Sequence, residues 1–227
     1  MGKCFSDAVE EALRYIYYDV RLGKGAEGLE LLKKASKEGD GDASCILARC
    51  MWGPQYVWRG HNFPVDEELG MKYLYQSVEQ GSALGVMVAV RCDEFSQEME
   101  QKMPYSSLKE VFNKVLEKAN AGDAFCQYTI GNSYFWGDFI DIEGINLKSF
   151  SSNEELKAYV TENTQKCEEW FWKALKGGIH FAVNNLKSYY TKGVDGYVEP
   201  QPSKAKDLYK IGAELGHPYW QWSYAEE

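Results

Sequence analysis

Two short patterns recur along the chain, and every copy ends at a glycine. The first pattern sets a small residue, an aliphatic residue and a tyrosine four residues apart, and it reads CQYTIGNSYFWG over 126–137 and AVNNLKSYYTKG over 182–193. These spacings put the matched side chains on one face of a helix that the glycine ends. The second pattern reads CEEWFWKALKGG over 167–178 and AKDLYKIGAELG over 205–216, with weaker copies over 28–39 and 70–81.

The glycines that close successive units are nearly evenly spaced. They are separated by 42, 41, 56 and 38 residues and are Gly39, Gly81, Gly122, Gly178 and Gly216. A period of roughly 40 residues is typical of stacked helix pairs, in which no pair buries its apolar face alone and the stack supplies the core. We therefore expect an all-α fold, a curved solenoid of about five antiparallel helix pairs with one continuous core.

Apolar periodicity and helix-start signals place the individual helices. We expect an opening helix over 6–20, followed by helices over 26–38, 42–53, 66–80, 84–97, 106–121, 123–136, 153–177, 180–192, 202–215 and 218–225. Asp66 is expected to cap the start of its helix. Ser107 with Glu110, and Ser152 with Glu155, have the spacing of capping boxes.

Two connections are longer than a turn between helices. The first covers residues 54–65 and holds Tyr56, Trp58 and Phe63, and the second covers residues 138–152 and precedes a lengthened helix. Insertions in repeat folds lie on one face or edge of the stack. They either pack their own aromatic side chains onto the helix ends or form part of a binding edge, and the sequence leaves both interpretations open.

The repeated segments resemble the Sel-1-like repeat (SLR), a relative of the tetratricopeptide repeat with two antiparallel helices per unit. GDAFCQYTIGNSYFWG, followed by WFWKALKGG, is similar to its consensus, and the resemblance runs from about residue 26 to the end. It implies a single repeat domain over 1–227, with an N-terminal helix or cap over 1–25, repeats over 26–216 and a capping helix over 217–227. Residues 83–95 lose the tyrosine and glycine, and Lys187 stands where the family has a small glycine, so close helix packing there requires the ammonium to reach solvent.

Composition narrows the class of partner. The chain has 34 acidic against 25 basic side chains and a formal charge of −9. Binding to a nucleic-acid backbone needs clustered Lys and Arg, so we expect no nucleic-acid partner. No apolar run reaches the length of a signal peptide or a membrane span, and we expect a cytoplasmic protein that does not bind membranes.

The reactive residue types show no catalytic or metal-binding spacing. Six cysteines stand singly in apolar patterns without C-x-x-C, and we interpret them as small core residues rather than a disulfide framework. The three histidines belong to no H-E-x-x-H motif, and the chain has neither a G-x-S-x-G elbow nor a phosphate-binding glycine loop. We therefore expect no catalytic residue, metal site or cofactor.

The resemblance also implies where a partner binds. In tetratricopeptide-like solenoids the first helix of each pair lines a concave groove, and its non-packing positions face the partner. Carried onto this chain, the groove positions are Arg49 and Trp52; Met87 and Arg91; Tyr128, Asn132 and Phe135; Asn184 and Ser188; and Tyr219 and Trp222. Aromatic side chains give contact area, Arg binds carboxylates, and Asn pairs with peptide backbone. The alternative for Trp52, Phe135 and Trp222 is packing against neighbouring loops, and for the two arginines an internal salt bridge.

These features predict a non-catalytic scaffold that binds a peptide or protein partner in its concave groove, with a monomer favoured. One alternative is a hydrolase or small-molecule binder for β-lactams or cell-wall material, as the cysteine-rich branch of the family implies. The chain lacks the paired cysteines of that branch. A second alternative is a purely structural repeat that associates with itself.

Overall fold

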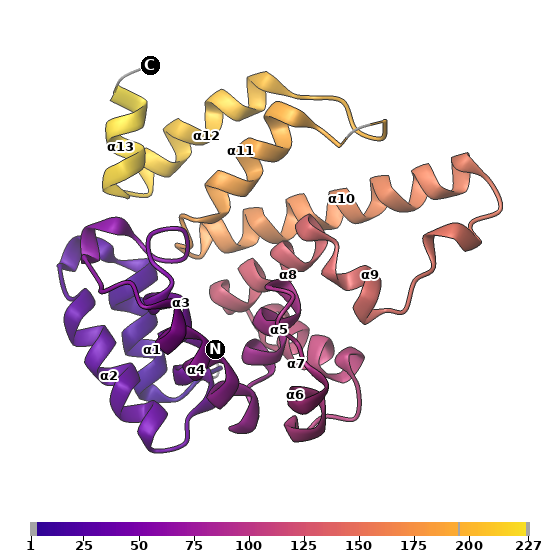
Figure 1. The fold of residues 1–227 in the computed structure, drawn as a ribbon. Helices are drawn as coiled ribbons and strands as arrows, with labels where there is room; N and C mark the ends of the chain where they lie inside the picture. The colour runs from indigo at the N-terminus through magenta and orange to yellow at the C-terminus, as the bar shows by residue number, and fades with distance from the viewer. Residues whose placement is uncertain (1–3, 195, 226–227) are drawn as a thin grey trace. The chain divides into compact units, whose positions relative to one another are not determined.

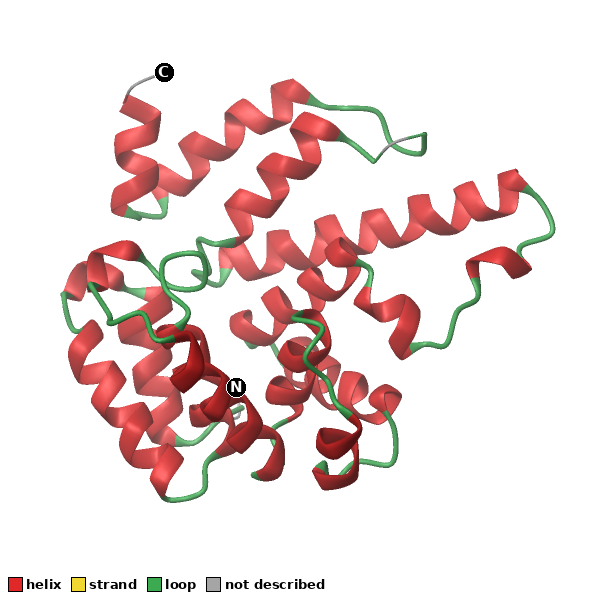
Figure 2. Cartoon of the chain, viewed as in Figure 1, coloured by secondary structure: helices red, strands yellow, loops and turns green. Residues whose placement is uncertain are grey.

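The computed structural model describes residues 4–194 and 196–225, apart from the side chains of Tyr219 and Ser223. Its α-helices are α1 (Asp7–Leu13), α2 (Gly25–Lys37), α3 (Gly41–Met51), α4 (Glu67–Glu79), α5 (Ala83–Arg91), α6 (Gln97–Lys102), α7 (Leu108–Asn120), α8 (Ala124–Trp136), α9 (Asp138–Ile142), α10 (Asn153–Lys176), α11 (Ala182–Lys192), α12 (Pro202–Glu214) and α13 (Pro218–Ala225). The described residues contain no strand beyond an isolated bridge between Val194 and Val198 (Figure 2). The predicted all-α class is confirmed.

The chain divides into two compact units, Met1–Gly122 and Asp123–Glu227. The boundary follows one of the closing glycines of the repeat, immediately before Asp123 caps α8. A single repeat domain over 1–227 stays a prediction.

The N-terminal unit is built from successive helices that pack on one another. Helix α1 packs on α2, α2 on α3, α3 on α4 and α5, and α5 on α7 (Figure 1). The side chains of Leu13, Leu32, Leu47, Leu74 and Leu84 lie between these helices and are almost completely buried. Apolar side chains at helical spacing thus form a shared core, as expected of stacked pairs.

In the C-terminal unit the 24-residue helix α10 packs on both α8 and α11, α11 packs on α12, and α12 on α13 (Figure 1). Gly131 of α8 is essential to the first contact, because a Cβ there would lie 2.6 Å from Cδ1 of Phe171 on α10. Lys187, which replaces a small residue of the repeat, places its ammonium 4.5 Å from the ring centroid of Tyr209 on α12. The cation is therefore accommodated on an aromatic face.

Helix ends follow the predicted chemistry. All five closing glycines have positive φ, for example +97° at Gly39 and +100° at Gly178, which is the left-handed conformation that glycine adopts without strain. The next residue caps the following helix in three cases: Asp40, Ser82 and Asp123 each accept a hydrogen bond from a backbone N–H in the first turn. The chain therefore reverses direction at each of these glycines and starts a new helix at once.

The predicted caps occur, with one difference. The Asp66 carboxylate accepts from the N–H of Leu69, and the Ser107 and Ser152 hydroxyls accept from the N–H groups of Glu110 and Glu155. The glutamates, however, do not bond back to the capping serine. Each accepts instead from the backbone N–H and the hydroxyl of the serine one residue earlier, at position 106 or 151. A second serine outside the helix offers two donors to one carboxylate, which a standard capping box does not.

Three local features differ from the predicted helices. The opening helix changes to a π-helix over Arg14–Tyr18, which carries the buried residues Tyr15, Ile16 and Tyr17. The helix expected over 84–97 ends at Arg91, because Asp93 adopts φ +58°, and a separate helix, α6, follows. The insertion 138–152 contains the short helix α9.

Candidate functional site

In the N-terminal unit two of the predicted groove residues, Arg49 and Trp52, contact Tyr56 of the insertion 54–65. Arg49 is only 7% exposed; its Nε donates to the hydroxyl of Tyr17 at 3.2 Å, and its guanidinium lies 5.4 Å from the ring centroid of Tyr56. Trp52 packs on the same Tyr56 ring at 5.1 Å between centroids. Met87 is buried. The insertion therefore supplies an aromatic ring to a place that the sequence pattern assigns to a partner.

Two further contacts hold the insertion. The hydroxyl of Tyr56 lies 4.0 Å from the thiol of Cys92, and Nε2 of His61 lies 2.9 Å from the carbonyl oxygen of Ile16. Burial raises the pKa of both Tyr56 and Cys92, and burial lowers the pKa of His61, so all three favour their neutral forms. Of the two interpretations of this insertion, the structure shows packing of its aromatic side chains onto its own unit.

The predicted groove residues of the C-terminal unit have several environments. Tyr128 and Asn132 on α8 are buried, and the Oδ1 of Asn132 accepts from Nδ2 of Asn185 at 2.7 Å. Asn184 is exposed on α11, and Trp222 on α13 is 60% exposed. The side chain of Tyr219 lies outside the described residues.

Phe135 and Ser188, two residues of the predicted set, meet in one hollow of about 290 Å³ between α8, α10 and α11. We call it the α8–α10–α11 hollow, and its lining residues are Tyr134, Phe135, Thr164, Cys167, Ser188, Tyr189, Lys192, Gly193 and Val194. Just outside this lining, the ring of Trp136 lies 5.0 Å from that of Phe135, and this indole is 63% exposed. The hollow is thus an aromatic recess with an exposed indole beside it.

The polar groups of the hollow are few. Burial raises the pKa of Tyr189 to about 12, so its phenol is neutral at physiological pH. The Cys167 thiol donates to the carbonyl oxygen of Gly131 at 3.6 Å, which satisfies it within the core. Lys192, in the last turn of α11, is exposed and makes no ion pair with any residue that the structure describes. The hollow therefore has one available cation and otherwise neutral walls.

Sequence reasoning misses most of this lining. The repeat pattern assigns Tyr134 to packing between helices and Cys167 to the core, and both positions also border the hollow. Lys192 has no distinguishing signal beyond its place before the closing glycine of its pattern. The hollow lies between three helices, and the residue pattern of a single helix does not reveal which helices will surround it.

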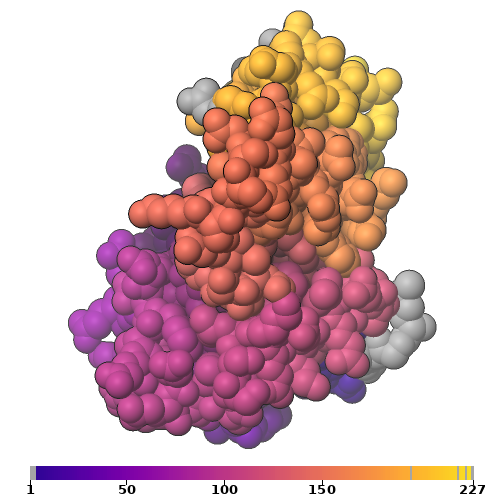
Figure 3. All heavy atoms as spheres, turned by 90° about the vertical axis from the view of Figure 1, so that its right-hand side faces the viewer, coloured from indigo at the N-terminus to yellow at the C-terminus, as the bar shows by residue number. Residues whose placement is uncertain are grey.

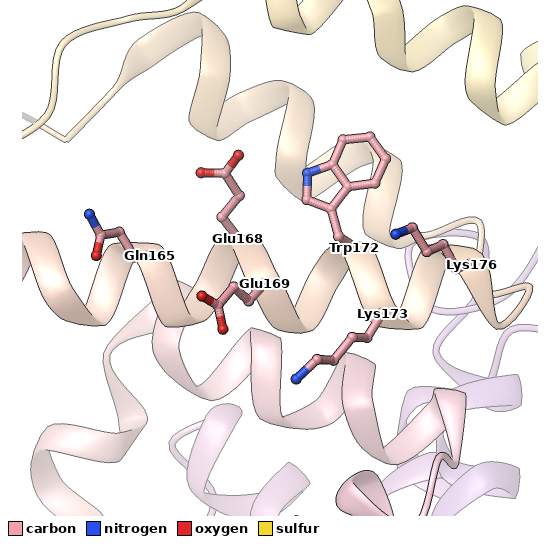
Figure 4. A pocket seen from close by; sticks show the side chains of 6 residues that line it. All are labelled: Gln165, Glu168, Glu169, Trp172, Lys173 and Lys176. Atoms are coloured by element: carbon pink, nitrogen blue, oxygen red, sulfur yellow. The ribbon is translucent and has the colours of Figure 1, made fainter.

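A second hollow, of about 490 Å³, lies along one side of α10 (Figure 4). Its lining residues are Gln165, Glu168, Glu169, Trp172, Lys173 and Lys176. At its edge Tyr190 of α11 donates a short hydrogen bond to the Glu168 carboxylate and accepts one from Nε1 of Trp172 at 3.0 Å, while Lys204 of α12 lies 3.3 Å from the same carboxylate. This network joins α10, α11 and α12.

Figure 3 shows another side of the C-terminal unit, where the α9–α10 segment lies on the surface.

The described residues supply no metal-binding cluster: no three His, Cys, Asp or Glu side chains are grouped to hold an ion. Each of the six cysteines is a thiol, and Cys45, Cys50, Cys126 and Cys167 are buried, which agrees with their interpretation as core residues. Burial raises the pKa of Cys45 and of Cys50 to about 12, so neither provides a thiolate nucleophile at neutral pH.

Among the helices described, none is both long and apolar enough to cross a membrane.

No family model matches the chain, and no curated protein is similar to it. The solved structures to which this chain is similar include two repeat proteins. The first is a Sel1 repeat protein from Oxalobacter formigenes, 21% identical, with 88% of this chain and 49% of that chain covered and a TM-score of 0.33. The second is a protective antigen present in uropathogenic Escherichia coli strains displaying an SLR fold, 16% identical, with 96% and 55% covered and a TM-score of 0.32.

Both matches bear the name of the repeat that the sequence pattern resembles. This chain spans about half the length of either solved structure. The helix-pair architecture described above rests on the contacts within each unit of this chain.

Proposed function

We propose that the chain is a non-catalytic helix-repeat scaffold whose C-terminal unit binds a peptide segment of a protein partner in the α8–α10–α11 hollow. The observation that supports this most directly is an aromatic recess beside the exposed indole of Trp136 and the available cation of Lys192. Aromatic anchors in a recess, with a polar rim, are typical of protein-binding surfaces. Phe135 and Ser188 line this hollow and also belong to the groove positions that the sequence predicts.

The size of the hollow favours one side chain over a whole small molecule. At about 290 Å³ it is at or below the lower end of small-molecule sites, which enclose about 300 to 1,000 Å³. A single aromatic or large aliphatic side chain of a peptide fills a recess of this size. The neighbouring residues of that peptide would then cross Trp136 on one side or Lys192 on the other.

The charge beside the hollow indicates which residue type stands next to the anchoring side chain in the bound peptide. Lys192 is exposed and has no internal carboxylate partner among the described residues, while Tyr189 stays neutral. An acidic residue next to the anchor pairs with the Lys192 ammonium, and a basic residue is repelled by it. We therefore propose an occupant with an aromatic or large aliphatic anchor beside Asp or Glu.

The test uses the full chain and an array of short peptides with a central Phe, Trp, Leu or Ala and a neighbouring Glu or Lys. Peptides with an aromatic or leucine anchor beside Glu should bind, and those with Ala or Lys should not. Ser188→Trp, which fills the hollow, should abolish binding. Lys192→Glu should weaken it about tenfold, whereas Lys206→Glu, an equal charge change on the exposed side of α12, should not. Equal binding by wild type and Ser188→Trp would refute the site.

A further variant tests how far the binding surface extends. Asn184 lies one helical turn before Ser188 on α11 and is exposed, but it does not line the hollow. Loss of binding in Asn184→Trp as well as Ser188→Trp would support the longer groove that the sequence register predicts. Loss in Ser188→Trp alone would limit the surface to the hollow.

A further inference from the structure

Helix α10 carries a largely exposed stripe, whose Trp172 also donates a hydrogen bond through Nε1 to Tyr190 of α11. The stripe consists of Gln165, Glu169, Trp172, Lys173 and Lys176, and all but the half-buried Trp172 are exposed. Spacings of three and four residues place these side chains on one side of the helix over nearly three turns. In Figure 4 the side chains of Glu169 and Lys173 extend below α10, and the indole of Trp172 extends above it. We call this set the α10 stripe.

Ion pairs among the described residues do not neutralise the charges of the α10 stripe. Glu169 and Lys173 have the favourable i,i+4 order, yet the structure records no ion pair between them; the Lys173 ammonium lies instead 4.1 Å from the ring centroid of Trp170. On the same helix, Glu162 and Lys166, at the same spacing, do pair, at 2.7 Å. Among the described residues Glu169, Lys173 and Lys176 have no ion-pair partner at all.

The order of these charges makes the stripe complementary to itself. Its acidic residue precedes Trp172, and its two basic residues follow it. When two copies of α10 run antiparallel with Trp172 near the two-fold axis, Glu169 of each copy faces Lys176 of the other. The two residues are seven positions apart, about 10.5 Å along each helix. A partner of a single charge sign would pair with only one of Glu169 and Lys176, whereas a second copy pairs with both, and Lys173 stays at the edge of the stripe on the ring of Trp170.

We propose that the α10 stripe is a dimerisation surface, on which a second copy of the chain packs its own α10 antiparallel, with Trp172 against Trp172. Such an interface is isologous, so each contact occurs twice. Offset or edge-to-face packing of the two indoles provides the centre, and the two Glu169–Lys176 pairs fix direction and register. This dimer replaces the monomer that the sequence favours, and it does not depend on peptide binding in the α8–α10–α11 hollow.

Sedimentation velocity of the full chain, from low micromolar to near-millimolar concentration, should show a monomer–dimer equilibrium that weakens as salt is added. Glu169→Lys and Lys176→Glu each juxtapose like charges twice across the axis and should each weaken the dimer about tenfold or more. Mixed in equal amounts, these two variants should form a heterodimer. At each of its two charge pairs, a residue of one variant then faces a residue of opposite sign in the other variant.

Lys157→Glu is the matched control, since it makes the same charge change on an exposed part of α10 outside the stripe. It should dimerise as the wild type does, and far-UV circular dichroism and melting should show all variants folded. A wild type that stays monomeric at low salt at the highest concentration would overturn the proposal. So would a dimer that persists unchanged in both single variants, or two variants that fail to associate when mixed.

Discussion

Replacing Tyr190 by Phe removes one hydroxyl on which three helices converge. That hydroxyl donates to the Glu168 carboxylate of α10 and accepts from Nε1 of Trp172, and Lys204 of α12 reaches the same carboxylate at 3.3 Å. Tyr190 is 1% exposed, so water does not replace the lost hydroxyl, and its ring still fills the core in the variant. The change therefore removes hydrogen bonds without opening a cavity.

The magnitude follows from the two bonds. A hydrogen bond to a charged group contributes about 1.5–3 kcal/mol and a neutral one about 1 kcal/mol. The Glu168 side chain is 22% exposed and keeps Lys204, so it recovers part of the loss through solvent and that ion pair. We expect Tyr190→Phe to destabilise the C-terminal unit by about 2 kcal/mol, and with a urea m-value of about 2 kcal/mol/M the unfolding midpoint falls by about 1 M.

The adjacent tyrosine provides a matched control. Tyr189 is also buried, but its hydroxyl makes no hydrogen bond with any described residue, so Tyr189→Phe should change stability by less than about 0.5 kcal/mol. Urea unfolding measures the stability of both variants. Amide hydrogen exchange over α10, α11 and α12 reports the stability of the C-terminal unit separately from that of the rest of the chain. If the midpoint of Tyr190→Phe fell no further than that of Tyr189→Phe, the three-helix network would not stabilise the unit.

Two further predictions concern titratable groups of the N-terminal unit. Burial lowers the folded-state pKa of His61 below its unfolded value of about 6.5, so the unfolded state binds more protons and stability falls as pH drops below that value. His61→Gln keeps a donor for the Ile16 carbonyl oxygen without titrating, so its melting temperature between pH 7 and 5 should fall less than that of the wild type; parallel curves would contradict this. Cys45 and Cys50, with pKa values of about 12 and no exposure, should resist alkylation in the native protein, whereas the half-buried Cys92 should react, as peptide mass spectrometry can measure. Equal labelling of all three before unfolding would refute the burial argument.

The helices of this chain could be predicted because their signals are local. The closing glycines, the caps at Asp66, Ser107 and Ser152, and the apolar spacing each act within a few residues, and the structure has helices at every predicted place. The π-helix after α1 could not be predicted in this way. No local signal over residues 14–18 distinguishes it from the α-helix that the apolar spacing predicts.

The candidate site is harder to predict for the same reason. The groove register includes Phe135 and Ser188, which line one hollow, but it also includes Arg49, which the structure places beneath Tyr56 of the insertion. A register defines which side of a helix a residue occupies. It does not define what covers that side, which at Arg49 is decided by how the insertion that follows α3 folds back onto the helix.

The sequence by itself determined that this chain is an all-α repeat, where most of its helices lie, and which residues cap or close several of them. Only the tertiary structure decided that the insertion 54–65 covers the groove positions of α3, that an aromatic hollow lies between α8, α10 and α11, and that Glu169 and Lys176 of α10 have no ion-pair partner among the described residues. The physical reason is range. Capping and helical periodicity act over three or four residues, whereas burial and charge pairing depend on side chains brought together from distant parts of the chain.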